Sequence, residues 1–444
     1  FEGKAFRIIH SAEVSKEEGT GAMSVTPPYG SVDFELGAAQ GVEIFDPVGG
    51  EGRFTDAVPE LEGKHAMGSD AEIMRMLEAK GLLFKWGLLR HSYPFCWRCN
   101  TALIHKDLDA WFVKTSDARE RIIGLNEEIR WIPEAFKHGR FGNFLADVKD
   151  WAISRTRYWG IPLPVWRCSK GHEVCVGSYE ELRSLSLSPL SAELDPHRPA
   201  IDEVVLACPE CSGEMRREEF VIDCWYDSGC APFAQYHYPF ENIEEFDTHK
   251  SVDFIAEDVN QTRGWFYTQL ALGTLLFDKP AFLSVLVLGN VFDEHGKHFS
   301  LDSGNIIDPE DIFSTVGADA TRLLFLGNPV WQNVQFSKEK VRETMVGTLS
   351  TLLNVYAFFA SNANAYGFRI VQGYGRTHDL DRWIMSRLQT ATKEARAGFE
   401  ELEVHRSVRA ITSFVEDLSG WYVRRSRRRF WEESDPQDRF SAHC

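Results

Sequence analysis

The clearest pattern of apolar and polar positions lies between residues 253 and 309. Residues 253–256 form a short apolar run, and residues 282–288 form an almost unbroken one. The residues that mark a helix between them are Trp265, Phe266, Leu270 and Leu275. An unbroken apolar run is typical of a strand buried on both faces, as in parallel sheets. The order therefore predicts a right-handed strand–helix–strand crossover, whose first strand ends at an acidic turn.

Polar residues follow both predicted strands. Glu257 and Asp258 come directly after the first strand, and the Gly- and Ser-rich loop Gly296–Asn305 comes after the second. Ligands of open parallel sheets bind beyond the carboxyl ends of the strands. We therefore expect these two segments to face one site.

The remaining periodic segments are helical. A helix is predicted at Asp70–Lys80 within a small α/β piece (residues 1–88), and another at Asp311–Leu326 after Pro309. Residues 340–435 are predicted to be helical throughout, including helices at Asp379–Phe399 and Ser407–Trp431. The apolar face of its first helix is formed by Val341, Met345, Leu349, Leu352, Leu353, Val355, Tyr356 and Phe359.

Composition limits the class of protein. A chain of 444 residues can hold two to four domains. No apolar run is long enough to predict a membrane span, and no signal peptide opens the chain, so we expect a cytoplasmic protein. The net charge of −18 argues against nucleic-acid binding by bulk charge but leaves room for a local basic face.

The spacing of the nine cysteines favours a metal site over disulfides in a chain of this kind. Cys168 and His172 precede Cys208 and Cys211 by about forty residues, which is a common layout of structural zinc. Cys175 could replace His172 as the fourth ligand, and reduced cysteines left over from a lost site are the alternative. Cys96 and Cys99 form only half of such a site, because two thiolates do not complete a tetrahedron.

Near the C-terminus, aromatic residues bracket a basic run. The run contains Arg424, Arg425, Arg427, Arg428 and Arg429. Such a run favours a phosphate-binding face, although a solvated basic stripe would have the same pattern.

Several stretches resemble isoleucyl-tRNA synthetases, which are class I aminoacyl-tRNA synthetases. Residues 253–309 resemble the second half of the nucleotide-binding domain of that family, and residues 150–160 and 223–229 are similar to neighbouring core motifs. Residues 19–37 resemble the second half of the editing domain, and residues 417–431 resemble the helical anticodon-stem domain. Since these motifs agree in order and spacing, the chain is identified as a member of this family. It corresponds to an internal fragment without the N-terminal half of the catalytic domain.

In the family, the loop after the second strand carries a Lys-Met-Ser-Lys-Ser signature whose lysines hold ATP phosphates. The five aligned positions here are His298, Phe299, Ser300, Leu301 and Asp302, so only the serine is kept. The flanking residues remain: Asp293, Glu294, Gly296, Gly304, Asn305, Asp308 and Pro309. We call residues 293–305 the signature loop.

The resemblance implies further roles. Glu257, Asn260 and Gln261 would contact the aminoacyl-adenylate, and Trp265 would close the aliphatic pocket; Asp258, Asn260 and Leu288 depart from the family pattern. Asp33, with Thr20 nearby, would bind the substrate ammonium in editing, although Ser24 replaces a family histidine. Arg155 and Arg157 suit phosphates of the tRNA acceptor stem or the substrate, and most of the tryptophans nearby are expected in the core.

The prediction is therefore an α/β chain: the second half of a class I Rossmann-type parallel-sheet catalytic domain, with part of an editing domain, a zinc-binding insertion and a C-terminal helical bundle. The expected segments are 1–88 (editing), 89–165 (return to the core), 166–220 (zinc insertion), 221–340 (catalytic) and 341–444 (anticodon-binding). The implied function is isoleucine–tRNA ligation by a monomer. The implied ligands are isoleucine, ATP with Mg²⁺, Zn²⁺ and tRNA-Ile, and editing of mischarged Val-tRNA is a further family activity. The alternatives are a catalytically inactive paralogue that binds tRNA or a protein, and a truncated or misread coding sequence.

Overall fold

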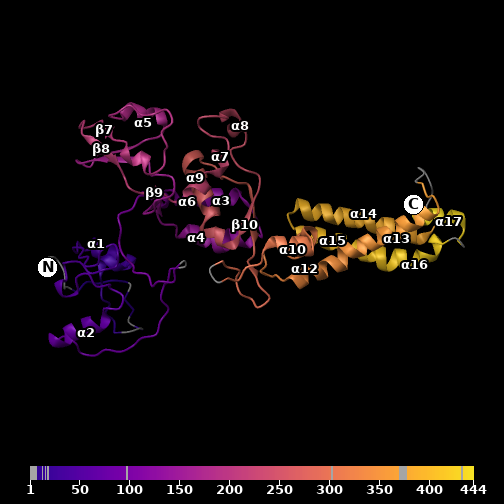
Figure 1. Ribbon diagram of the computed structural model, residues 1–444, viewed down its shortest axis with the longest axis horizontal. Coiled ribbons are helices and arrows are strands. Elements are labelled where there is room, and N and C mark those ends of the chain that lie inside the picture. The colour runs from indigo at the N-terminus through magenta and orange to yellow at the C-terminus, as the bar shows by residue number, and fades with distance from the viewer. Residues whose placement is uncertain are drawn as a thin grey trace. The chain divides into compact units, whose positions relative to one another are not determined.

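The computed structural model describes residues 8–444 except 13, 16, 18, 19, 97, 98, 302, 303, 370–377, 432 and 433. The chain forms two compact units, Phe1–Asp109 and Ala110–Cys444. Figure 1 shows the order of their elements. The finer division into five segments stays a prediction.

The first unit is built from turns and two short helices, α1 (Ser31–Ala39) and α2 (Asp70–Ala79). Helix α2 confirms the predicted helix. In the described part of this unit, extended pairing is confined to isolated bridges such as Val48 with Phe54, so it has less strand than expected. Among the described residues of this unit, the buried apolar side chains are Pro27, Pro28, Val48 and Leu61.

The second unit contains a parallel sheet in the order β10-β11-β2. The bounds are β2 (Arg130–Ile132), β10 (Ile255–Asp258) and β11 (Ser284–Leu288), with α9 (Trp265–Phe277) between the last two. The predicted crossover is therefore confirmed. Strand β10 runs through Glu257 and Asp258, which pair with Val287 and Leu288, so the acidic pair lies in the strand and not in a turn. The sequence analysis missed β2, because three residues are too short to show a period.

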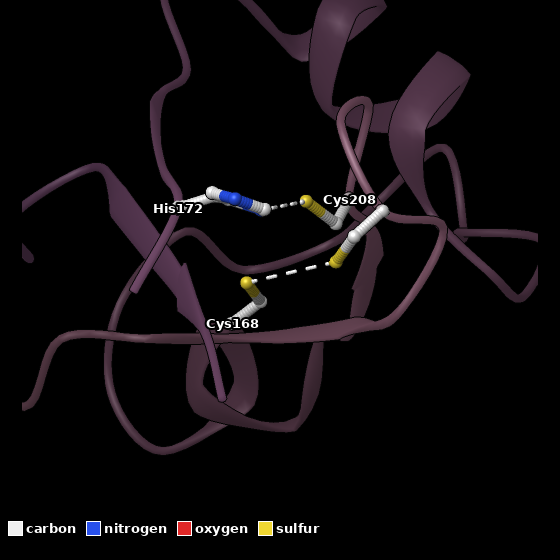
Figure 2. Close-up of side chains that lie close together, drawn as sticks. Cys168, His172 and Cys208 are labelled. Carbon is white, nitrogen blue, oxygen red and sulfur yellow. Dashed lines mark hydrogen bonds between the residues drawn. The ribbon is translucent and has the colours of Figure 1, made fainter. Parts of the chain in front are cut away.

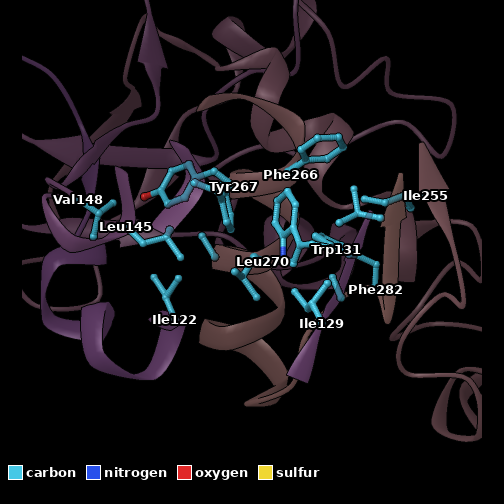
Figure 3. Close-up of a cluster of buried hydrophobic side chains, with 14 of the residues drawn as sticks. Ile122, Ile129, Trp131, Leu145, Val148, Ile255, Phe266, Tyr267, Leu270 and Phe282 are labelled. Atoms are coloured by element: carbon cyan, nitrogen blue, oxygen red, sulfur yellow. The ribbon is translucent and has the colours of Figure 1, made fainter. Parts of the chain in front are cut away.

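Helix α9 is buried against this sheet, and the hydrophobic core around it is shown in Figure 3. Trp131 of β2 packs edge-on against Phe266, with ring centroids 5.8 Å apart, and lies 4.7 Å from the ring of Phe141. Helices α3 (Arg119–Glu128) and α4 (Gly142–Ala146) supply Ile122 and Leu145 to the same core. This core holds β10 and β11 in place as parallel neighbours, so both strands end at the same edge of the sheet.

A separate four-stranded antiparallel sheet has the order β6-β5-β8-β7. Its elements are β5 (Val165–Cys168), β6 (Glu173–Cys175), α5 (Tyr179–Leu185), β7 (Leu206–Ala207) and β8 (Glu214–Arg217). Trp166, Leu206 and Met215 form its core. We call residues 165–217 the Cys/His subdomain.

Short elements join the sheets. Strands β1 (Phe112–Val113) and β3 (Trp151–Ala152) pair antiparallel, as do β4 (Ser154–Arg155) and β9 (Val221–Ile222). They are followed by α6 (Cys224–Gly229), α7 (Ala231–Ala234) and α8 (Ile243–Thr248). Beyond β11, β12 (Val291–Phe292) pairs in parallel with β13 (Val334–Gln335). The helix predicted at 311–326 is two helices, α10 (Pro309–Thr315) and α11 (Ala318–Leu326), because Gly317 adopts φ +102° between them.

The C-terminal part is a helical bundle. Its helices are α12 (Lys338–Thr344), α13 (Thr351–Ala365), α14 (Asp379–Glu400), α15 (Val404–Glu416), α16 (Arg424–Ser426) and α17 (Pro436–His443). Helices α14 and α15 are antiparallel neighbours, as Figure 1 shows. The predicted helices are confirmed, but the chain is not helical throughout, because the described residues 368–369 and 403 lie between helices.

The helical run Lys338–Ala365, which joins α12 to α13 through a π-helical turn, is long and apolar enough to cross a membrane by length and composition. This corrects the expectation that no apolar run reaches that length. Val341 of the predicted apolar face is buried, but Leu353 is 65% exposed. Phe358 packs edge-on against Phe430 of the bundle, with ring centroids 5.1 Å apart.

Candidate functional site

The carboxyl ends of β10 and β11 lie side by side. Asp258 pairs with Leu288 in the ladder, and Asn260 Nδ2 donates to Asn290 Oδ1 across 3.4 Å. The segments that follow the two strands therefore meet, as predicted for one site.

The residues after β10 are held in fixed positions. Asp258 Oδ1 accepts the amide N–H of Asn260 at 2.6 Å, which starts a tight turn, and Gln261 Oε1 accepts the amide N–H of Trp265 at 3.1 Å. A Cβ at Gly264 would lie 2.6 Å from Gln261 Oε1, so a side chain there would displace the end of Gln261. Trp265 Nε1 donates to the carbonyl of Ser228 in α6 at 2.9 Å. Gln261 and Trp265 are thus positioned, whereas Glu257 and Asn260 are exposed.

Asp223, at the start of α6, organises the neighbouring motifs. Its buried carboxylate accepts from Arg155 at 2.8 Å and from Trp151 Nε1 at 3.3 Å. Arg155 also donates to the carbonyls of Ala152 and Ser154. Because Asp223 and the two carbonyls already bind its guanidinium, we assign Arg155 a structural role. Burial, and then the charge of Asp223, raise the pKa of the neighbouring Asp227 carboxyl above its ordinary value.

The described part of the signature loop keeps an internal scaffold. Asp293 Oδ1 accepts the amide N–H groups of His295 (2.9 Å) and Lys297 (2.7 Å). Asn305 Nδ2 donates to Asp293 Oδ2 at 3.1 Å and to the carbonyl of His298 at 2.9 Å. The amide of Lys297, foremost among these donors, lowers the pKa of Asp293. The loop is therefore folded by its flanking residues.

The side chains that the scaffold presents lack the cations of the signature. The His298 ring packs on Phe292, with centroids 4.3 Å apart, and Leu301 is 82% exposed. Ser300 pairs with Asn305 across the loop. Asp302 lies outside the described residues. The sequence analysis did not single out Lys297, which is exposed and is the only Lys or Arg between residues 293 and 305.

Four predicted metal ligands converge in the Cys/His subdomain. The ligand atoms of Cys168, His172, Cys208 and Cys211 all lie within 4.8 Å of one another. Cys208 Sγ is 3.4 Å from His172 Nδ1, as Figure 2 shows, and Cys211 Sγ is 3.9 Å from Cys168 Sγ. Four ligands at zinc bond lengths would be separated by about 3.5 Å (S to N) and about 3.8 Å (S to S). The donor set therefore fits a tetrahedral ion.

Electrostatics in this cluster favour a thiolate at Cys208. Burial acts to raise the pKa of this thiol, but the backbone N–H groups of Cys211 and Glu210 and the His172 side chain outweigh it, and the pKa falls to about 6. Cys175 lies on β6, outside the group of four, so His172 is the fourth member.

Cys96 and Cys99 remain a pair. Among the described residues the only His/Cys/Asp/Glu group arranged for metal is the one in the Cys/His subdomain. Cys99 Sγ and Thr101 Oγ1 lie 3.2 Å apart, and a hydrogen bond from the Thr101 hydroxyl to the thiolate is the first cause of the lowered pKa of Cys99.

The predicted editing residues have local partners within the first unit. Asp33 Oδ2 accepts the amide N–H of Thr26 at 2.8 Å, and Thr20 Oγ1 donates to the carbonyl of Ala22 at 3.4 Å. Asp33 therefore stabilises the turn before α1, and its role toward a substrate stays a prediction.

The basic run near the C-terminus divides into an outer and an inner part. Arg424, Arg425, Arg427 and Arg428 are exposed. Arg429 is only 8% exposed and binds Asp381 through two hydrogen bonds of 2.7 and 2.9 Å. The structure removes Arg429 from the predicted RNA-binding set, because its guanidinium is held inside the bundle.

Comparison with known proteins places these features in a family. The sequence profile described as tRNA synthetases class I (I, L, M and V) matches residues 9–337, and that of the anticodon-binding domain of tRNA ligase matches residues 381–444. Isoleucine–tRNA ligase of Picrophilus torridus is 44% identical over 96% of this chain and 41% of its own length. Isoleucine–tRNA ligase of Clostridium acetobutylicum is 43% identical over 99% and 43%, respectively. The chain thus spans less than half the length of these relatives.

A solved structure supports the fold. Methionyl-tRNA synthetase of Mycobacterium tuberculosis in complex with methionyl-adenylate matches with a TM-score of 0.57 and 16% identity, over 79% of this chain and 60% of that chain.

Proposed function

Because the chain belongs to the class I tRNA synthetases, we propose that it is part of an isoleucine–tRNA ligase, which joins isoleucine to tRNA-Ile at the expense of ATP. The assignment of isoleucine as the amino acid rests on the 44% and 43% sequence identity, across almost the whole chain, to two relatives named isoleucine–tRNA ligase. The parallel sheet with its two converging strand ends supplies half of a nucleotide site of this class.

This chain's own residues act by positioning. In-line phosphoryl chemistry needs few reacting side chains, so catalysis depends on orientation and on charge stabilisation. Gln261 and Glu257 would hold the adenylate at the end of β10, with Asn260 beside them, and Trp265, fixed by Ser228, would close the pocket for the aliphatic side chain. ATP with Mg²⁺ would bring its phosphates to the signature loop, where His298 and Leu301 stand in place of lysines.

Zinc would be held by Cys168, His172, Cys208 and Cys211, where it stabilises the Cys/His subdomain and does not take part in the reaction. The convergence of the four donor atoms supports this assignment. The exposed arginines Arg424, Arg425, Arg427 and Arg428 would bind tRNA phosphates. We also propose a cytoplasmic location, because none of the nine cysteines forms a disulfide.

A second candidate function is a catalytically inactive synthetase-like protein that binds tRNA. The specific observation in its favour is the signature loop, where the hydrogen bonds of Asp293 and Asn305 are kept although both lysine positions have changed. The two candidates share RNA binding and differ in adenylate formation.

Fluorescence anisotropy with labelled transcripts tests the isoleucine assignment. The chain is expected to bind tRNA-Ile more tightly than tRNA-Met at the same salt concentration. Equal affinity for the two transcripts would reject the amino-acid assignment and leave a tRNA-binding protein. An absence of tRNA binding would reject both candidates.

A further inference from the structure

Residues 82–89 carry apolar side chains that the first unit does not cover. Leu82 is 70% exposed, Phe84 is fully exposed, Trp86 is 61% exposed and Leu88 is 98% exposed. These four positions alternate along the chain, as do the side chains on one face of a β-strand. Apolar side chains that are exposed together in this way are typical of interaction surfaces.

The backbone of this segment is also unpaired. The chain has neither helix nor strand from Leu82 to Pro94. Between Leu83 and Arg90, no backbone N–H or carbonyl group forms a hydrogen bond with a described residue. The segment therefore lacks both of the things that a strand obtains from a neighbour, which are cover for its side chains and partners for its backbone.

A second copy of the same segment could supply both. Two antiparallel strands related by a two-fold axis have one residue that lies opposite itself, and this centre decides which side chains meet. A centre at Lys85 would set two ammonium groups against each other, which is destabilising. A centre at Phe84 would need Lys80 to pair, but the amide of Lys80 is already hydrogen-bonded in the last turn of α2. A centre at Gly87 would leave Phe84 opposite Arg90.

A centre at Trp86 avoids these defects. It places Trp86 opposite Trp86 and Phe84 opposite Leu88, and cross-strand pairs of aromatic and aliphatic side chains stabilise sheets. On the other face it places Lys85 opposite Gly87. A Cβ at Gly87 would meet nothing within 4 Å, so the stem of the lysine has room there. Because both copies use the same edge, the contact closes at two chains.

We propose that residues 82–90 pair antiparallel with the same residues of a second copy, so that the chain forms a homodimer centred on Trp86. This differs from the monomer that the family resemblance implies. The proposal is independent of the proposed function, because the pairing segment belongs to the first unit and the arginines assigned to tRNA belong to the second.

Charge exchange at the centre tests this register in the full chain. Trp86→Lys and Trp86→Asp should each lose the dimer, because each places two like charges opposite each other. An equal mixture of the two variants should regain it as a heterodimer. Ile44→Lys is the matched control, since Ile44 is 51% exposed in the same unit but lies outside the segment, and it should dimerise as the unmodified chain does. Sedimentation velocity over a series of concentrations measures each sample.

An unmodified chain that stays monomeric at every concentration overturns the proposal and leaves the segment for a strand of a different protein. A dimer that persists in Trp86→Lys also overturns it, because the contact then lies elsewhere. Loss of the dimer in both variants without recovery on mixing, at unchanged circular dichroism, rejects the two-fold pairing at Trp86. Anisotropy with tRNA-Ile on the same samples reports on the proposed function separately, since the monomeric variants should bind it as the unmodified chain does.

Discussion

The metal-ligand cluster of the Cys/His subdomain and the signature loop are both built on tight turns closed by hydrogen bonds to the backbone, and they differ in the side chains that those turns present. In the first, Cys168 N–H bonds the carbonyl of His172, and Ser212 N–H bonds that of Cys208, and four donor atoms converge. In the second, Asp293 and Asn305 close the loop just as fully, but no lysine stands at either phosphate position. Scaffold and chemistry thus depend on different residues, so one can change while the other is kept.

The largest expected effect is on the metal. Purified chain should hold close to one zinc, and Cys208→Ser should release it, because the substitution removes one of the four ligands of a tetrahedral site. Cys96→Ser is the matched control and should leave the zinc content unchanged. Elemental analysis after reduction and dialysis provides the measurement. A chain free of zinc, or zinc retained by Cys208→Ser but lost in Cys96→Ser, would show that the ligands are misassigned.

The next effect is on adenylate formation. The chain should show no useful isoleucine-dependent ATP–pyrophosphate exchange, because loss of each preorganised donor costs about a hundredfold or more in rate. His298→Lys with Leu301→Lys should restore little alone. The same double change should restore much more when the N-terminal half of a related isoleucine–tRNA ligase catalytic domain is supplied.

The signature loop provides the control for that experiment. Asp293→Ala in the restored protein should abolish the gain, because it removes the acceptor of the Lys297 and His295 amides. Robust exchange by the unmodified chain would mean that its loop binds ATP without the lysines, and the comparison between scaffold and chemistry would fail.

A smaller effect tests whether the buried and the exposed arginines of the basic run have different roles. Arg429→Met should lower the free energy of unfolding by about 3–5 kcal/mol, because it leaves buried Asp381 without its cation. Arg428→Met, one residue away and exposed, should change it little. Chemical denaturation followed by circular dichroism compares the two, and equal losses would contradict the assignment of inner and outer arginines.

The pH dependence follows from Asp381. Burial acts to raise its pKa, but Arg429, Ser441 and Tyr422 outweigh it and lower the pKa below its ordinary value. A depressed pKa contributes stability above the pKa of the unfolded chain, near 4, and that contribution is lost as the pH falls through the lower value. Acid unfolding of the bundle should therefore shift to higher pH in Arg429→Met.

The smallest effect is on RNA. Arg424, Arg425 and Arg428 changed together to Ala should weaken tRNA binding and reduce the salt slope by about 2 to 3, since each phosphate contact contributes about 0.9. Titrations at several salt concentrations measure both. An unchanged slope would mean that the arginines are a solvated face.

The sequence predicted the parts of the fold that carry long or unbroken patterns. The run at 282–288 and the helix at Trp265–Phe277 were visible because parallel strands and their crossover helix are apolar throughout. Strand β2 was not predicted, since the three residues Arg130–Ile132 can be recognised as a strand only from their pairing with β11. The break at Gly317 was also missed, because a positive φ at glycine is set by the packing of α10 and α11.

Residues of the candidate site could be predicted where the groups that act together lie close in the sequence. The spacing of Cys208 and Cys211 is visible in the sequence, and the structure brings this pair together with Cys168 and His172 as predicted. The roles of Arg155 and Arg429 were not predictable, because each depends on a carboxylate far away in the chain, Asp223 or Asp381. Lys297 was overlooked, and the exposure of Trp159 was not predicted, since exposure cannot be read from a motif.

Strand β10 has one neighbour in the described sheet, β11, and so presents an outer edge. That edge is four residues long and ends in Glu257 and Asp258. A short, charged edge is a poor template for the strand of another molecule. Aggregation of this chain at high concentration should begin at the apolar helical run Lys338–Ala365, where Leu353 and Tyr356 are both 65% exposed. Charged substitutions at these two positions should suppress the aggregation that light scattering measures.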